Sequence, residues 1–394
     1  MNYLLFDDPI IRPNLLPLTF TRPISELRCG IWRITEKWTD FLQVKPSFLT
    51  ENYLQAKYPA IFTDDNLYLN GAVCPTLALV EAVKKLQFGE VLFYQEHVVA
   101  YRAGKCALTN LLDEATHAKV LHWEESLTVI RQLPDIFVYN GEQISADFQR
   151  ITAGRSSQPI TDRFTACYNE SQIFVEEGAD IKNASLNATG GPIYIGRNAQ
   201  IMEGALIQGP FAILDHSVVS LGGKMRPNTS IGPYCKVGGE LGGSVIIGYS
   251  NKGHEGYMGN AVIGEWCNWG ADTNNSNLKN DYGTVKIWNY ARQQYIDTGR
   301  QFVGLFMGDH SKTGINTMFN TGTVVGVSVN VFGGGLPPKH IQSFSWGGAD
   351  TRFEVYKFEK AMQVARNTME RRNIVLDETE ARILKHVFDL TYPM

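Results

Sequence analysis

Long apolar runs and paired cysteines are both missing from this sequence of 394 residues. The longest apolar stretches, such as residues 323–331, are too short to span a bilayer, so no membrane segment is predicted. Six cysteines lie far apart without a Cys-X-X-Cys pair, which argues against a disulfide framework. The first residues have neither a basic stretch nor a small-residue cleavage site. These features predict a cytoplasmic protein with reduced thiols.

An excess of charge of one sign is also missing. The 36 lysines and arginines nearly balance the 40 aspartates and glutamates, for a formal net charge of −4. This balance gives no sign of a nucleic-acid partner or an anionic membrane surface. The length exceeds that of a usual single core and predicts at least two domains. The 37 glycines indicate many tight turns.

A period of six residues dominates the middle of the chain. Eight apolar residues follow one another at this spacing without a miss: Ile195, Ile201, Ile207, Ile213, Val219, Met225, Ile231 and Val237. Six of the seven residues four positions after these anchors are small: Ala199, Ala205, Ser217, Gly223, Thr229 and Cys235, with Phe211 as the exception. A second run contains Met307, Thr313, Phe319, Val325 and Val331, and Ile263 and Trp269 bridge the two runs.

This period fits neither a helix of 3.6 residues per turn nor an alternating strand. It predicts a β-solenoid from about residue 173 to 331, in which short strands point one aliphatic residue inward and small residues occupy the corners. An ordinary β-sandwich is the alternative interpretation of the glycine and valine content. The repeat breaks between Gly242 and Met307, which is where a functional site is expected in a repeat scaffold.

The two flanks have different patterns. Phe358, Met362, Ala365 and Met369 have helical spacing, and Asp377 with Glu380 forms a capping-box pattern that predicts a second helix. We expect these helices to cover the open end of the solenoid. Near the N-terminus, apolar strands at 3–6, 67–69 and 90–93 alternate with helical stretches such as 77–86, a pattern typical of a small α/β domain. The predicted boundaries are therefore 1–155, 156–348 and 349–394.

The pairs Ile195-Gly196, Ile231-Gly232, Val237-Gly238, Ile263-Gly264 and Val325-Gly326 resemble the hexapeptide repeat of left-handed β-helix acyltransferases. The resemblance implies a left-handed parallel β-helix. It also implies a homotrimer, because such enzymes build each active site between neighbouring subunits.

The segment Leu15–Pro23 resembles the signature of sugar-1-phosphate nucleotidyltransferases. This chain departs from that signature at its catalytic points: residues 7–13 contain no glycine, Asn14 replaces the arginine, Ile24 the lysine and Ala72 the metal-binding aspartate. We expect a degenerate domain that needs Mg²⁺ only if it is active. Candidates for phosphate contact, if they are not simply solvated, are Arg12, Arg22 and Arg28.

Together the two parts resemble the bifunctional family that combines UDP-N-acetylglucosamine diphosphorylase with glucosamine-1-phosphate N-acetyltransferase, here with a shortened first domain. Its acetyltransferase segment is similar to Lys252–Asn260, in which His254 follows Gly253. The resemblance implies acetyl-CoA as co-substrate and His254 as catalytic base. It also implies a set of substrate-binding residues: Lys236, Lys252, Tyr257, Asn277 and Lys286. Lys286 is included because Gly283 stands where the family has a lysine, and Lys286 is the nearest lysine to it.

An amino sugar attacks a thioester only as the free amine, so a base that works near neutral pH is needed, and histidine suits this. Two function classes stay open: an acyl-CoA-dependent N-acetyltransferase for an amino-sugar phosphate, and a non-catalytic protein that binds sugar nucleotides. Three further histidines, His216, His310 and His340, raise the alternative of a zinc site, although their spacing matches no such pattern. The asparagines near residue 275 could instead form an internal ladder: Asn274, Asn275 and Asn277.

Overall fold

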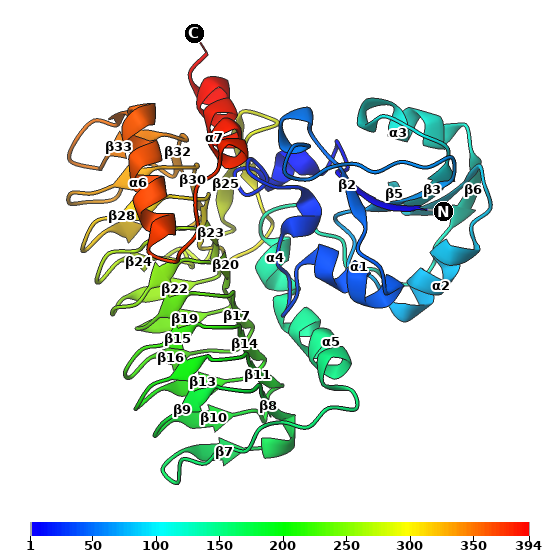
Figure 1. The fold of residues 1–394 in the computed structure, drawn as a ribbon. Helices are drawn as coiled ribbons and strands as arrows, with labels where there is room; N and C mark the ends of the chain where they lie inside the picture. The colour runs from blue at the N-terminus through cyan, green and yellow to red at the C-terminus, as the bar shows by residue number, and fades with distance from the viewer. Residues whose placement is uncertain (1, 394) are drawn as a thin grey trace.

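The computed structural model describes residues 2–393 and begins with a six-stranded mixed sheet (Figure 1). Its strand order is β2-β1-β3-β5-β4-β6, with β1, β2 and β3 parallel to one another and β5 antiparallel to both β3 and β4. The strands are β1 (Asn2–Phe6), β2 (Ser47–Leu49), β3 (Asn66–Asn70), β4 (Glu90–Tyr94), β5 (His97–Ala103) and β6 (Lys119–His122). The helices are α1 (Ile34–Leu42), α2 (Leu77–Lys85), α3 (Leu108–Thr116), α4 (Asp135–Val138) and α5 (Asn140–Thr152). The predicted α/β domain is confirmed.

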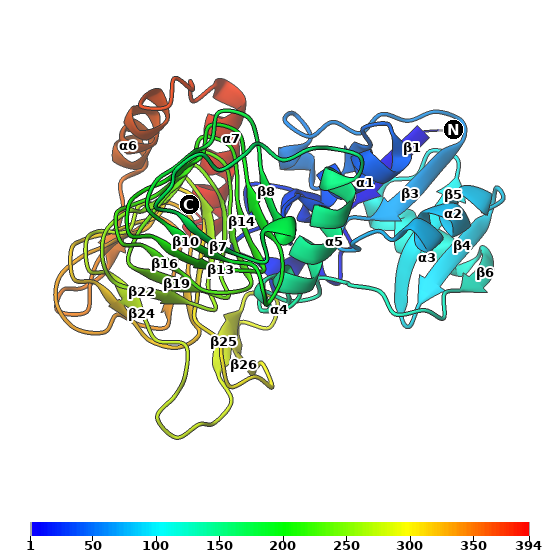
Figure 2. The same ribbon diagram turned by 90° about the horizontal axis from the view of Figure 1, so that it is seen from below.

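A parallel β-solenoid follows, with three flat faces (Figure 2). The open face contains β7 (Ala166–Tyr168), β10 (Ser185–Asn187), β13 (Leu206–Gln208), β16 (Lys224–Met225), β19 (Glu240–Gly242), β22 (Tyr257–Gly259), β24 (Asn274–Asn275) and β29 (Met318–Phe319). The covered face contains β8 (Ile173–Val175), β11 (Ile193–Ile195), β14 (Phe211–Ile213), β17 (Thr229–Ile231), β20 (Val245–Gly248), β23 (Val262–Glu265), β27 (Leu305–Met307), β30 (Thr323–Val325) and β32 (His340–Ile341).

The third face, here called the helix face, contains β9 (Asp180–Ile181), β12 (Gln200–Ile201), β15 (Val218–Val219), β18 (Lys236–Val237), β21 (Asn251–Lys252), β28 (Lys312–Thr313), β31 (Asn330–Val331) and β33 (Ser345–Gly347). The short strand β34 (Glu354–Val355) pairs antiparallel with β33. All eight anchors of the first six-residue run, from Ile195 to Val237, are at most 1% exposed inside the solenoid. The predicted parallel β-helix is confirmed, because one hydrophobic column per face explains the period.

The repeat breaks inside the predicted interval of residues 242–307, but only in its second half. Successive coils advance by eighteen residues from Ile207 to Met225, then by sixteen to Leu241 and seventeen to Met258, so the period shifts while strand pairing continues. The actual insertion comes later, after β24, and contains the antiparallel hairpin of β25 (Lys286–Asn289) and β26 (Gln294–Asp297). The segment around Lys252 therefore belongs to regular coils, not to an insert.

The N-terminal domain and the solenoid share one hydrophobic core. Apolar residues of the first domain pack in the same cluster as outward-facing residues of the covered face, among them Val245, Ile247, Val262 and Val324. Helix α5 lies along β14 and β17 (Figure 1). Buried charges join the same surfaces: Arg22 donates to Asp309 at 2.5 Å and to Glu265 at 3.1 Å. The first domain is therefore fixed to the solenoid over much of the length of the covered face.

Two helices end the chain, α6 (Phe358–Glu370) and α7 (Glu378–Thr391). Both were predicted, and Asp377 caps α7 by accepting a hydrogen bond from the Glu380 amide at 2.8 Å. The expectation that they cover the open end of the solenoid is wrong. They lie along its side, because the corner that carries Trp266 and Phe344 offers them an apolar surface (Figure 2). No helix within residues 2–393 is long and apolar enough to cross a membrane.

Candidate functional site

The three arginines predicted to contact nucleotide phosphates are all buried, at 2–5% exposure, and bonded to the protein itself. Arg12 donates to Asp7 at 2.5 Å and also to the Thr19 carbonyl. Arg22 is paired with carboxylates of the solenoid, and Arg28 donates to the carbonyl of Ile247 at 3.2 Å and to that of Ile31. These guanidinium groups are bonded mainly to the protein itself and hold the signature segment in place, although Arg22 Nη1 is buried without a hydrogen-bond partner among residues 2–393.

A magnesium ion does not fit this domain. The position expected to supply the metal ligand is Ala72, which is fully buried among apolar residues. Within residues 2–393, no three histidine, cysteine, aspartate or glutamate side chains are placed to hold a metal ion. Hard cations such as Mg²⁺ require oxygen ligands, and the methyl group of Ala72 supplies none.

We predict that the chain releases no pyrophosphate from UTP and N-acetylglucosamine-1-phosphate when magnesium is present. The reason is that the charge of a triphosphate has neither a metal nor a free arginine to balance it. A coupled phosphate assay measures the release. Turnover above about 1 s⁻¹, at the low end of ordinary enzyme rates, would contradict this prediction.

Lys252 takes an interior position of the solenoid. It pairs in register with the buried Val237 of the previous coil and is itself only 1% exposed. Its ammonium group donates to the carbonyl oxygens of His254 at 2.6 Å and Glu255 at 2.8 Å. Burial lowers the pKa of Lys252 to about 8, although the charges of Glu255 and Asp272 act in the opposite direction. In this single chain, the ammonium braces the turn that carries His254 and does not face the solvent.

The lowered pKa of Lys252 predicts a pH-dependent stability. Between about pH 8 and 10.5 the folded chain releases the lysine proton before the unfolded chain does, so the unfolded state binds more protons. The free energy of unfolding should therefore rise with pH in this window, by up to about 3 kcal/mol. Urea titrations of the wild type and Lys252→Met at both ends of the window measure this rise. Equal slopes in the two proteins would contradict it.

His254 lies in the corner between β21 and β22, with an exposed side chain. Among residues 2–393, no side-chain hydrogen bond of this imidazole is formed. The neighbouring Gly253 lies against Lys236 of the previous coil, because a Cβ placed on Gly253 would be 3.8 Å from the Cβ of Lys236. An exposed imidazole and an exposed ammonium group therefore sit on adjacent coils at the same edge of the helix face.

Tyr257 and Asn277 meet at a different corner, between the open and covered faces. The Asn277 amide donates to the Tyr257 hydroxyl at 3.0 Å and to Asn260 Oδ1 at 2.7 Å. Gly259 makes room for this contact, since a Cβ at that position would lie 2.2 Å from the Tyr257 hydroxyl oxygen. Strand β22 separates this corner from His254 by about 10 Å. Within one chain, the predicted catalytic and sugar-binding residues thus form two separate groups.

The remaining predicted residues lie elsewhere. Asn275 is buried and exchanges hydrogen bonds with the backbone of Gly259, while Asn274 accepts from the Tyr257 amide at 2.7 Å. These two asparagines bond to the backbone of the preceding coil and do not form a ladder with one another. Lys286 is exposed on the hairpin, opposite Asp297.

The three histidines considered for zinc do not converge. His216 stacks on Tyr234 at a solenoid corner, with ring centroids 4.7 Å apart. His310 stacks in the same corner column at 6.3 Å from Trp266, and burial lowers its pKa to about 3. His340 instead stacks on the ring of Trp288, 4.3 Å away. All three are therefore accounted for by aromatic stacking.

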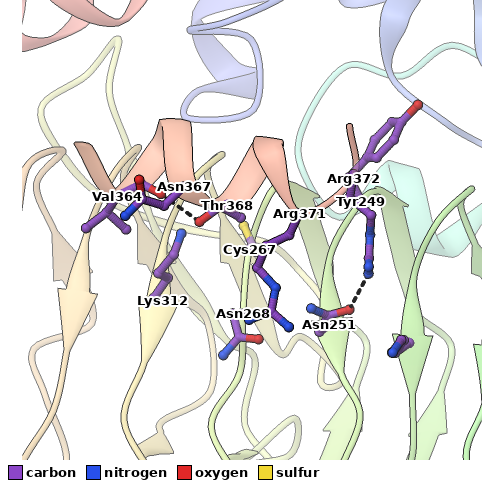
Figure 3. Close-up of a pocket in the computed structure, with 11 residues that line it drawn as sticks. Tyr249, Asn251, Cys267, Asn268, Lys312, Val364, Asn367, Thr368, Arg371 and Arg372 are labelled. Carbon is purple, nitrogen blue, oxygen red and sulfur yellow. Dashed lines mark hydrogen bonds between the residues drawn. The ribbon is translucent and has the colours of Figure 1, made fainter. Parts of the chain in front are cut away.

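A cavity of about 420 Å³ lies between α6 and the helix face (Figure 3). Its wall contains Lys236, which the sequence predicted, together with cations that it did not: Lys312, Arg371 and Arg372. The polar wall is completed by Asn251 and Asn268. The lysines and asparagines belong to one outward column of the helix face, and the two arginines directly follow α6, with Arg371 as its C-cap. The column could have been found by continuing the repeat from Lys236, but nothing in the sequence places α6 over it.

Comparison with known proteins identifies the first domain. Residues 3–156 match the family model described as sugar nucleotidyl transferase. This part of the chain is similar to sugar nucleotidyl transferases. The match agrees with the resemblance of residues 15–23, and in this nucleotidyl transferase-like domain Arg12 and Arg22 are bonded to carboxylates of the chain itself.

Several of the curated relatives are bifunctional transferases. A bifunctional sugar-1-phosphate nucleotidylyltransferase/acetyltransferase of Sulfurisphaera tokodaii is 33% identical over 148 residues, which are 37% of this chain and 36% of the relative. The bifunctional protein GlmU of Methanococcus aeolicus is 35% identical over 104 residues, 26% of this chain and 25% of the relative. The matches thus span about a quarter to a third of these relatives. The predicted resemblance to the bifunctional family, a nucleotidyl transferase domain followed by a hexapeptide-type β-helix, is confirmed.

The crystal structure of the polySia specific acetyltransferase NeuO also matches, at 14% identity and a TM-score of 0.27. That match covers 48% of this chain and 81% of NeuO.

Proposed function

We propose that this chain is an acyl-CoA-dependent N-acetyltransferase that acts on an amino-sugar phosphate, with acetyl-CoA as co-substrate. The β-helix carries the reaction, and the nucleotidyl transferase domain serves as a fixed structural part of the molecule. The placement of His254 carries the proposal. Its imidazole is exposed and free of intramolecular side-chain bonds, and it lies one coil away from the exposed ammonium group of Lys236.

The chemistry follows from these two groups. The sugar amine attacks the thioester carbonyl carbon, a C–N bond forms, and the C–S bond breaks. His254 accepts the proton that the amine loses, and the departing sulfur finally takes up a proton to leave as the thiol. Lys236 binds the phosphate of the sugar as a point charge. The buried Lys252 fixes the turn of His254 through the carbonyls of residues 254 and 255.

A thiol-detection assay tests this proposal. Purified full-length protein is mixed with acetyl-CoA and glucosamine-1-phosphate, and CoA release is followed against a control without sugar. Release that depends on the sugar supports the acetyltransferase. If neither glucosamine-1-phosphate nor UDP-linked amino sugars stimulate release, the alternative of a non-catalytic sugar-nucleotide binding protein replaces this proposal.

The separation of His254 from Asn277 supports a homotrimer. Strand β22 lies between them in one chain, and a neighbouring copy would offer a second way to bring the two groups to one site. The open face of the solenoid has no cover within residues 2–393 and exposes Leu206 and Met318, at 52% and 44%. Cyclic assembly would place the corner of His254 in one subunit next to the corner of Asn277 in another.

Co-expression of two inactive variants tests this arrangement. Random trimers of His254→Ala and Asn277→Ala subunits should recover about a quarter of wild-type activity, because a quarter of the shared sites combine the two intact residues. Each variant alone stays inactive. Light scattering checks the trimer mass. No recovery in mixed trimers, or a monomer mass at micromolar concentration, would contradict the shared site.

A further inference from the structure

The cavity between α6 and the helix face contains unpaired positive charge. Lys236, Lys312, Arg371 and Arg372 line it, no carboxylate does, and none of the four forms an ion pair with another residue within the described chain. Several buried cations elsewhere have carboxylate partners, as Arg22 has in Asp309 and Lys37 in Asp147, whereas the buried Lys252 donates to backbone carbonyls. Lys236 and Arg371 are exposed to water, so the missing counter-charge matters most for the half-buried Lys312 and Arg372.

Two of these cations, Lys312 and Arg372, are partly withdrawn from water and have only neutral hydrogen-bond acceptors, with no negative charge to balance them. The Lys312 ammonium group donates to the carbonyls of Trp266 at 3.3 Å and His310 at 3.2 Å, and burial lowers its pKa. Arg372 donates to the Tyr234 carbonyl and to Asn251 Oδ1, both at 3.3 Å (Figure 3). Neutral acceptors at these distances make weak bonds to a charged donor. A bound anion would supply the negative charge that no carboxylate of the cavity wall provides.

The C-terminal end of α6 opposes anion binding, but only by the equivalent of about half a negative charge. Four full positive charges outweigh it. The two arginines at this helix end also provide planar donors that match phosphate oxygens in pairs.

The spacing of the cations sets the length of the ligand. Lys236, Asn251, Asn268 and Lys312 stand on successive coils of one outward column. Neighbouring coils are about 4.8 Å apart, so the two lysines are separated by about 14 Å. A ligand with two phosphoryl groups can contact both lysines without either side chain leaning toward the other. The amides of the two asparagines between them can bond to the uncharged or bridging parts of an elongated ligand.

We propose that this cavity binds a small molecule with two or more phosphoryl groups, held by Lys236 and Lys312 on the solenoid and by Arg371 and Arg372 directly after α6. The diphosphate of coenzyme A and that of a nucleotide sugar share this chemistry. This site goes beyond the proposed acetyl transfer. It rests on the proposed function only because Lys236 is assigned to phosphate binding in both.

Binding of inorganic pyrophosphate to the full-length chain tests the site by calorimetry, without turnover. The double variant Arg371→Ala/Arg372→Ala should weaken pyrophosphate binding about 10- to 100-fold, as expected for lost bonds to charged groups. Arg366→Ala is the matched control, because Arg366 is exposed on the same helix and does not line the cavity. Circular dichroism checks the fold, and Lys312→Met provides a second variant from the other wall.

The same calorimetric titration is repeated with three other ligands: orthophosphate, CoA and UDP-N-acetylglucosamine. Tighter binding of CoA or of the nucleotide sugar, with the same loss in the arginine variant, identifies the source of the phosphoryl groups. No pyrophosphate binding, equal binding of orthophosphate, or an equal loss in Arg366→Ala overturns the site. Acetyl transfer is measured separately. Pyrophosphate binding without transfer would disprove the proposed function alone, whereas transfer without pyrophosphate binding would disprove this site alone.

Discussion

His254→Ala should lower kcat for acetyl transfer by about two to four orders of magnitude, which is the usual contribution of a positioned general base. The KM for the sugar phosphate should change little, because the imidazole acts on the proton that is lost during attack and does not hold the phosphate. Steady-state CoA release at saturating acetyl-CoA measures both constants. A raised pH should partly restore the rate of the variant, since more of the amine is then already unprotonated.

His122→Ala is the matched control for His254→Ala. This histidine is also exposed, but it lies on β6 of the nucleotidyl transferase domain and is expected to leave the rate unchanged. If His254→Ala keeps most of the activity, the base is another group, while the fold and the reaction class are unaffected. If both variants lose activity, the assay reports folding and not catalysis.

Asp309→Asn should destabilise the molecule by about 3 to 5 kcal/mol, the second large effect that the structure predicts. This carboxylate is 4% exposed and accepts hydrogen bonds from Thr21 at 2.6 Å and Arg22 at 2.5 Å, both in the first domain. It also accepts from the amide of Glu265 at 2.8 Å. Its neutralisation leaves the buried guanidinium of Arg22 with Glu265 alone.

Urea unfolding followed by tryptophan fluorescence measures this loss. The control is Asp389→Asn, which removes the exposed pair with Lys385 on α7 and should cost about 0.5 kcal/mol or less. A loss for Asp309→Asn as small as that of the control would show that the pair between domains contributes nothing measurable.

The repetitive part of the fold could be predicted from the sequence because each coil repeats the same local requirement. Residues such as Ile213 and Ile231 face the same interior, so their spacing is visible without any long-range information. The shift at residue 242 was read as a break because two coils are shortened, which changes the period but not the pairing. The interior position of Lys252 was missed for a related reason. A lysine does not fit the apolar pattern of the interior column in which it follows Val237.

The roles of the arginines could not be predicted, because their partners are distant in the sequence. Arg22 has the motif context of a phosphate ligand, and only the folded chain brings it to Asp309 and Glu265. The same holds for the cavity under α6. Lys236 and Arg372 lie far apart in the chain and share a wall only because aromatic residues at the solenoid corner fix the helix there.

The continuous core between the two domains has a consequence for modularity. In a chain of independent modules, one module can be replaced by that of a relative without harm to the other. Here Ile247, Val262 and Phe306 of the β-helix are covered by the first domain, so any replacement must reproduce that surface. The first domain therefore has a structural role that does not depend on catalysis, because it covers part of the apolar surface of the β-helix.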